Sequence, residues 1–252
     1  MNLNEDNLKK SGGYLSLVLI LLYLAVEQLP WNRWFFNLYW ANTAILITRV
    51  FFLCFAIWRL LVRHYKIGPI LGKFPISLAF LPFFVLPFSN FVGSAIEGAS
   101  YSPSYPAGIL VLQGFSTLSL ATLEELLFRF LLFSYLSTRM KKSHALLLSS
   151  AIFGLLHFLN LLGGASIGST LLQVGYSFGN GLILGLLWWH GGGLLMPVLY
   201  HFLFNFFNDD LFTFFYQGDH GVMMMVTNIV FGAVALIYGI LLYFLYLRKR
   251  KA

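Results

Sequence analysis

Long apolar runs recur along the chain and are separated by short polar stretches. A transmembrane helix needs about 20 apolar residues to cross the hydrocarbon core of a bilayer. This pattern predicts an all-α, polytopic membrane helix bundle with about eight transmembrane helices. The predicted helices are residues 13–30, 36–58, 76–97, 106–137, 143–162, 170–189, 194–216 and 222–247.

The composition supports the same class of protein. The 252 residues are 59% hydrophobic and only 10% charged, whereas soluble domains carry about 25% charged residues. No long polar insertion separates the apolar runs, so we expect residues 1–252 to form one transmembrane domain, with its polar motifs in a core of about 105–216. The first run resembles a signal peptide in outline but lacks a small-residue cleavage site, which favours a first transmembrane helix.

The Lys and Arg residues predict the orientation, because cytoplasmic loops of membrane proteins are enriched in them. In an eight-helix topology, 13 of the 16 Lys and Arg residues fall on the side that holds both termini. They form clusters within residues 9–10, 59–73, 139–142 and 248–251. Both termini should therefore be cytoplasmic. The placement of these clusters between apolar runs also argues against a nucleic-acid partner, although the net charge is +7.

Three ionisable side chains interrupt the fourth run, which reads ATLEELLFRF at residues 121–130. Glu125 and Arg129 are four residues apart, so they share one helical face and can form an ion pair. Glu124 is turned about 100° away and lies about 20 Å from the cytoplasmic end of its helix. Ionisable groups at such depths usually face the bundle interior and serve a function. Glu124 suits a general base, and a charge network that only ties helices together is the alternative.

Polar side chains occur at similar depths in two later runs. Phe153 and His157 are four residues apart in FGLLH, and His201 and Asn205 are four residues apart in HFLFN. Each pair therefore projects from one face of its helix. Two imidazoles, an amide and the Glu124 carboxylate on three helices predict a polar site inside the bundle.

The motifs EExxxR, FxxxH and HxxxN, in this order on successive predicted helices, resemble those of the CPBP (Abi) family. This family comprises CAAX prenyl endopeptidases and bacterial relatives. The similarity extends over about residues 107–207 and includes the glycine-rich run LLQVGYSFGNGLILGLLW. It implies an intramembrane glutamate-type endopeptidase that cleaves a membrane-associated, prenylated or precursor peptide.

The resemblance also implies a role for each motif residue. Glu124 would activate the water that attacks the peptide bond, and His157 would help to hold it. His201 and Asn205 would polarise the scissile carbonyl and form an oxyanion hole. The expected partners are a membrane-bound peptide or protein substrate and the lipid bilayer. The supporting residues would be Glu125, Arg129 and Phe153.

Two other catalytic chemistries need consideration. Two histidines and Glu124 could form a zinc site with an open water position, but such a site needs a third strong protein ligand. Glu124 would then lose its role as base, so the sequence favours no metal. GYSFG at residues 175–179 matches the nucleophile elbow of α/β-hydrolases. It lies inside an apolar run, however, so its glycines, with Gly181 and Gly185, favour a helix-packing face.

Two non-proteolytic functions remain open at this stage. A membrane scaffold or bacteriocin-immunity protein could keep the polar cluster for packing. An ion- or proton-coupled transporter also uses carboxylates and histidines at mid-membrane, although the sequence shows no inverted repeat. The lack of a targeting extension or soluble domain favours a prokaryotic plasma membrane. Arg49, inside the second run, has no evident partner in the sequence.

Overall fold

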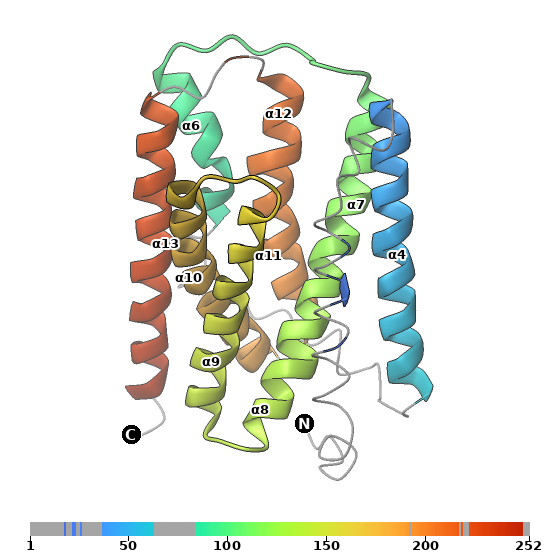
Figure 1. Ribbon diagram of the computed structural model, residues 1–252. Coiled ribbons are helices and arrows are strands. Elements are labelled where there is room, and N and C mark those ends of the chain that lie inside the picture. Colours follow the sequence, from blue (N-terminus) through green and yellow to red (C-terminus); the bar gives the residue numbers. More distant parts are fainter. Residues whose placement is uncertain are drawn as a thin grey trace.

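A computed structural model describes the chain from residue 37 onward, with gaps, and a few isolated earlier positions. Within this part, the chain folds into a bundle of helices (Figure 1). It has no β-strand, only an isolated bridge between Tyr101 and Tyr216. The all-α prediction is therefore confirmed. The described residues are 18, 22, 23, 26, 37–62, 84–191, 193–216, 218 and 222–248.

The helices follow the apolar runs of the sequence. A short 3-10 turn at residues 84–88 leads into α6, and the fourth predicted helix runs without interruption from α7 through η3 to α8. The bounds are α4 (Leu38–Val62), α6 (Ser89–Ile96), α7 (Ala107–Glu125), η3 (Leu126–Phe133), α8 (Ser134–Ser137), α9 (Lys142–Leu155), η4 (Leu156–Leu161), α10 (Ile167–Gly191), α11 (Leu195–Asn205), η5 (Phe206–Asp210), α12 (Leu211–Phe215) and α13 (Val222–Arg248).

Five of these helices are long and apolar enough to cross a membrane. They agree with the second, fourth, fifth, sixth and eighth predicted helices: Leu38–Trp58, Ala107–Ser137, Lys142–Leu161, Ile167–His190 and Val222–Leu245. The third is described only as the shorter apolar helix Phe84–Ile96. The seventh is helical from Leu195 to Phe215 but includes Asp209 and Asp210, and it is not among the five. The first lies largely outside the described residues, so the number eight stays a prediction.

The two ends of the bundle differ in charge. The turn between α8 and α9 lies at the bottom of Figure 1, together with the last residues of α4 and α13. Arg139, Lys141 and Lys142 belong to this turn or border it, and α13 ends at Arg248. The loop at residues 97–106 and the end of α12 lie at the opposite end. The basic clusters in the described part thus share one end, as the predicted orientation requires.

Helix α10 packs closely against α9 and α13 because glycines line its contact faces. A Cβ atom added at Gly179 would lie 2.6 Å from the carbonyl oxygen of Ala235 in α13. One added at Gly181 would lie 3.0 Å from Cβ of Ser150 in α9. Small residues therefore let these helix backbones approach each other, as predicted. Gly175 is different, since nothing lies within 4 Å of its Cβ position, and including it in the packing face was wrong.

This difference predicts opposite outcomes for two alanine substitutions in α10. Gly179→Ala should destabilise the protein by about 1–3 kcal/mol, because the added methyl group meets backbone atoms of α13 that cannot rotate away. Gly175→Ala should be neutral or slightly stabilising, since alanine is the better helix former. Thermal unfolding in detergent measures both, and equal midpoints for the two variants would contradict the packing described above.

Candidate active site

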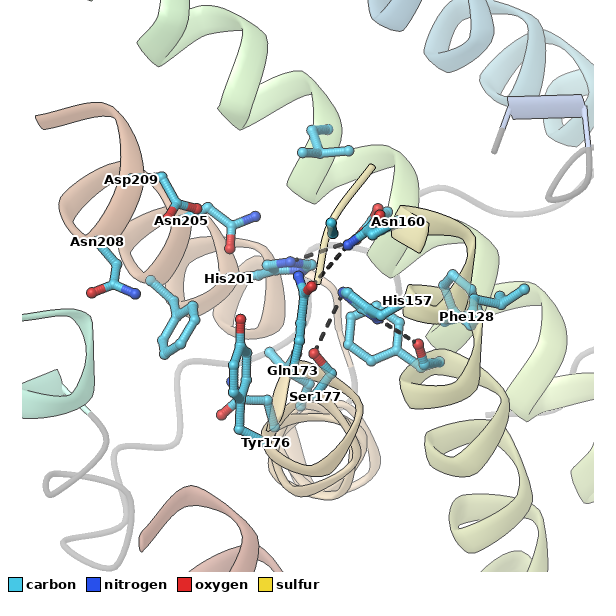
Figure 2. A pocket seen from close by; sticks show the side chains of 18 of the residues that line it. Phe128, His157, Asn160, Gln173, Tyr176, Ser177, His201, Asn205, Asn208 and Asp209 are labelled. Carbon is cyan, nitrogen blue, oxygen red and sulfur yellow. Dashed lines mark hydrogen bonds and ion pairs between the residues drawn. The ribbon is translucent and has the colours of Figure 1, made fainter. Parts of the chain in front are cut away.

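A cavity of about 670 Å³ lies between α7, η4, α10 and α11, and the motif residues meet in it. Glu124, His157, His201 and Asn205 all line this cavity. Figure 2 shows the side chains of His201 and Asn205, from α11, and of His157, from η4, directed into the same space. The three sequence motifs therefore form one site, as their order and depth predicted.

His201 is held by Glu125, which is completely buried. Nδ1 of His201 lies 2.9 Å from Oε1 of Glu125, and the other carboxylate oxygen, Oε2, lies 3.0 Å from Nε of Arg129. The ion pair predicted from the spacing of Glu125 and Arg129 is thus present. Because a carboxylate only accepts hydrogen bonds, Nδ1 of His201 carries a hydrogen atom.

The opposite nitrogen of the same imidazole faces Glu124. Nε2 of His201 lies 3.5 Å from Oε2 of Glu124, so one imidazole stands between both glutamates. This arrangement was not predicted from the sequence, which placed His157 beside Glu124 and His201 beside Asn205. Glu124 is partly exposed in the cavity, at 16% of its side chain, whereas Glu125 is at 0%. The two adjacent glutamates therefore occupy different environments.

Arg129 is buried, and its charge is balanced by a carboxylate and an aromatic ring. Its contact with Glu125 is close, but Nε and both Nη atoms have no aligned hydrogen-bond acceptor in the described part of the chain. Cζ of Arg129 lies 4.5 Å from the centre of the Phe153 ring. A cation over an aromatic face gains about 2 kcal/mol when both are desolvated, so Phe153 contributes to holding Arg129.

Phe153 also contacts both histidines, which explains why it precedes His157 by one helical turn. Its ring packs edge-to-face against the imidazoles of His157, at 5.5 Å between centres, and of His201, at 5.8 Å. It makes a similar contact with Phe128 at 5.0 Å. A single ring thus sets the positions of the catalytic candidates from η4 and α11.

His157 is oriented by the backbone of its own helix. Its Nδ1 lies 3.0 Å from the carbonyl oxygen of Phe153, and a carbonyl oxygen only accepts, so Nδ1 carries a hydrogen atom. In the neutral ring, Nε2 is then an acceptor, and it lies 3.4 Å from Oγ of Ser177. His157 thus presents a hydrogen-bond acceptor to the cavity.

Several amide and hydroxyl side chains complete the cavity wall, and the sequence motifs did not predict them. Asn160 donates to Oε1 of Gln173 at 2.8 Å, a contact between η4 and α10 that Figure 2 shows as a dashed line. The Tyr200 hydroxyl donates to Asn180 at 3.3 Å. Polar residues at successive turns of α10 were the available signal, but the glycines around them favoured a packing role.

All three motif helices depart from α-helical geometry at the site. The π-helix η3 begins directly after Glu125, the 3-10 helix η4 contains His157, and the π-helix η5 begins directly after Asn205. π-Helical segments are rare and occur frequently at functional sites. They change how far successive side chains rotate about the axis, which directs Glu124, His157 and Asn205 into one cavity.

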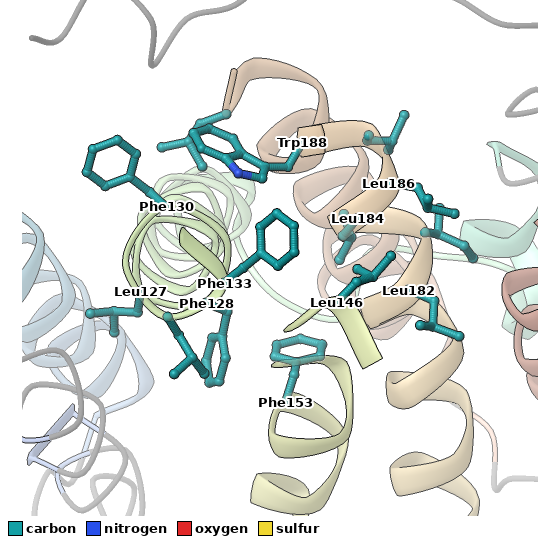
Figure 3. Packing of buried hydrophobic residues seen from close by; sticks show 14 of the residues in the cluster. Leu127, Phe128, Phe130, Phe133, Leu146, Phe153, Leu182, Leu184, Leu186 and Trp188 are labelled. Atoms are coloured by element: carbon teal, nitrogen blue, oxygen red, sulfur yellow. The ribbon is translucent and has the colours of Figure 1, made fainter. Parts of the chain in front are cut away.

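The floor of the cavity is a packed apolar core between η3, α9 and α10 (Figure 3). Phe128 and Phe153 separate the polar site from this core, in which Leu146 and Leu184 are almost completely buried. Phe130 packs edge-to-face on Trp188 at 5.8 Å. This core lies toward the basic end of the bundle and closes the cavity on that side.

Arg49, which had no partner at the sequence level, bonds to helix α7. Its Nη1 donates to Oγ of Ser116 at 2.9 Å, and its charge acts on the carboxylate of Asp210 in η5. Thr117 also donates to that carboxylate. Arg49 therefore connects α4 to α7 by a hydrogen bond and acts on η5 through the charge of Asp210.

Comparison with known proteins gives a family for the segment that carries the site. Residues 106–207 match the family described as type II CAAX prenyl endopeptidase, Rce1-like. Residues 106–207 are thus similar to the type II CAAX prenyl endopeptidases of the Rce1-like family. The resemblance to the CPBP family is thus confirmed, over nearly the same residues that the motifs covered. A comparison with curated proteins found no match.

The Rce1-like segment contains the three motifs and the whole π-helix η3. Its family is a protease family, and the apolar helices described above make the chain an integral membrane protein. In the described part, no three His, Cys, Asp or Glu side chains are grouped so that they could hold a metal ion.

Proposed function

We propose that this protein is an intramembrane glutamate-type endopeptidase that hydrolyses a peptide bond of a membrane-associated polypeptide. The observation that carries the proposal is that the residues of all three motifs line one cavity. It holds a partly exposed carboxylate, Glu124, within 3.5 Å of the His201 imidazole, with His157 and Asn205 in the same wall. The match to a protease family supports it.

In the proposed reaction, Glu124 is the general base. Its carboxylate takes one proton from a water molecule while the water oxygen bonds to the carbonyl carbon of the scissile peptide. The C–N bond then breaks, and the proton passes from Glu124 to the departing amine. One water is consumed, and a carboxylic acid and an amine are formed. General-base assistance of this kind contributes about 10²–10⁴-fold in rate.

His157 and Asn205 position the reacting groups. Nε2 of a neutral His157 accepts a hydrogen bond, because Nδ1 donates to the Phe153 carbonyl. His157 is therefore suited to orient the attacking water beside Glu124. The Asn205 amide lines the opposite wall and can donate to the oxyanion that develops on the carbonyl oxygen. One oxyanion donor is worth roughly 2.7–4 kcal/mol of transition-state stabilisation.

His201 serves as the second oxyanion donor when its ring is protonated. Nδ1 is engaged by Glu125 at 2.9 Å, so only Nε2 can face the substrate. Glu125 and Arg129 thus act through His201 rather than on the substrate.

We further propose that the reaction needs no metal and takes place in a prokaryotic plasma membrane. The first point is supported by the arrangement of the side chains, since the described part of the chain has no three His, Cys, Asp or Glu grouped so that they could hold a metal ion. Asn205 is a poor zinc ligand but a good hydrogen-bond donor. Glu124 would lose its role as base if it coordinated a cation.

A peptidase assay in proteoliposomes tests the proposal against serine and metal mechanisms. The purified protein is incubated with membrane-anchored peptides, and new termini are identified by mass spectrometry. Cleavage should persist within about twofold in Ser177→Ala, because Ser177 lies inside helix α10 and lacks the strand-turn-helix setting of a nucleophile elbow. Cleavage should also persist after dialysis against a strong chelator.

Other results would assign a different activity. Loss of cleavage in Ser177→Ala would favour a serine nucleophile paired with His157, and loss with the chelator that zinc restores would favour a metalloprotease. Absence of cleavage across a broad peptide panel, with the protein folded, would overturn the proposal. A scaffold or immunity role would then remain, or transport if solute flux were observed.

A further inference from the structure

The cavity has a closed end and an open end. Its closed end is formed by Phe128, Phe153, Leu184 and Tyr200, all of which are buried. Its other end is lined by residues 163–165, which belong to the exposed loop between α9 and α10. The route into the site therefore lies beside this loop and away from the turn between α8 and α9.

The open end is opposite the basic end of the bundle. In Figure 1, the loop between α9 and α10 points away from the turn between α8 and α9. That turn carries Arg139, Lys141 and Lys142, and its end holds 13 of the 16 Lys and Arg residues in the eight-helix topology. Such clusters remain in the cytoplasm. The cavity should therefore open on the extracytoplasmic side.

The charge of the cavity wall limits what part of a substrate it can hold. The described lining residues include the carboxylates Glu124 and Asp209 but no Lys or Arg. Asp209 is exposed at the open end. A free C-terminal carboxylate would meet carboxyl side chains and no permanent cation in the described wall, so it would find no favourable charge partner. An internal stretch of polypeptide has no such charge.

A second cavity lies next to the first and offers room for more polypeptide. It measures about 240 Å³ and reaches between α6, α10 and α13. Its wall includes Ser89, Asn90 and Asn228, whose side chains are joined by hydrogen bonds. The two cavities share Gln173, Tyr176, Phe204, Asn208 and Asp209. Two neighbouring cavities suit a chain that continues on both sides of the cleaved bond.

We propose that the site takes an internal segment of a polypeptide that is presented from the extracytoplasmic side of the membrane. This rests on the proposed function, and it narrows the substrate class. A precursor peptide or the outer part of a membrane-anchored protein fits this description. The carboxyl-terminal end of a prenylated cytosolic protein does not, because it lies on the wrong side and ends in an anion.

The side of the opening is tested by thiol labelling, which needs no catalytic activity. Cys54 is first replaced by Ser, and single cysteines are introduced as Ser166→Cys beside the open end and His144→Cys at the basic end, both at exposed positions. A membrane-impermeant maleimide should label Ser166→Cys in intact cells and His144→Cys only after permeabilisation. The reverse pattern would overturn the proposed side of entry and leave the proposed peptidase unaffected.

The substrate class is tested with two reporters in proteoliposomes. Both contain the same cleavable sequence, which continues past the cleaved bond in one and ends three residues after it with a free carboxylate in the other. The continuous reporter should be cleaved at least about tenfold faster, and Asp209→Lys should reduce this preference because it places a cation at the opening. A faster reaction with the carboxylate-ended reporter would contradict the proposed substrate class, whereas cleavage of neither would contradict the peptidase itself.

Discussion

Glu124→Gln is expected to lower the rate of peptide cleavage by about 10²–10⁴-fold, the range that general-base catalysis contributes. An amide has nearly the shape of a carboxylate but cannot take a proton from water. Glu124 is partly exposed in the cavity, and its neighbour Glu125 holds the buried contacts with His201 and Arg129. The thermal unfolding midpoint in detergent should therefore change little while the initial cleavage rate falls.

The chain offers a matched control for this substitution. Glu97 is exposed, lies outside both cavities and accepts a hydrogen bond from the backbone amide of Met223. Glu97→Gln keeps an oxygen that can accept this bond, so its cleavage rate should equal that of the unmodified protein. Cleavage by Glu124→Gln at the rate of this control would remove Glu124 from the mechanism and with it the glutamate-type assignment.

Arg129→Met is expected to have the largest effect on stability, about 3–5 kcal/mol, because it leaves a buried carboxylate without its cation. Glu125 has 0% of its side chain exposed and Arg129 only 1%. The substitution also removes the guanidinium from the Phe153 ring, which lies 4.5 Å away. The free energy of unfolding, measured by denaturant titration in detergent, should fall by most of this amount.

A double-mutant cycle separates the lost ion pair from lost packing. Combining Arg129→Met with Glu125→Gln removes both charges, so the double variant should be more stable than the sum of the single effects predicts. Arg139→Met, at an exposed position, should change the unfolding free energy by less than about 0.5 kcal/mol. Strict additivity of the two buried substitutions would show that Glu125 and Arg129 do not depend on each other.

Local features of the site followed from spacing along the chain. The pair of Glu125 and Arg129 was predictable because residues four apart on a helix are neighbours whatever surrounds them. The common depth of Glu124, His157 and His201 was predictable for a similar reason, since rise per residue is nearly constant. The apolar runs also located the five long helices, because length and composition are sufficient for that purpose.

Contacts between helices were not predictable in the same way. The bond from His201 to Glu125 joins residues 76 positions apart, and it depends on how each helix is rotated about its axis. The segment LLFRFLLF of η3 is apolar on nearly every side, so its hydrophobic pattern contains no information about rotation. The partner of Arg49 was missed for a related reason. Ser116 lies in a run where small polar residues occur at several positions, so the sequence does not indicate which of them contacts Arg49.

The π-helical segments make the site sensitive to chain length as well as to chemistry. A π-helix accommodates extra residues in each turn compared with an α-helix. Deleting one residue within Leu126–Phe133 would let this stretch relax to an ordinary helix and turn Glu124 by about 100° relative to the core below it. Single-residue insertions and deletions here should therefore be tolerated far less well than side-chain exchanges on the lipid-facing surface, because the length of this segment determines how the candidate site is assembled.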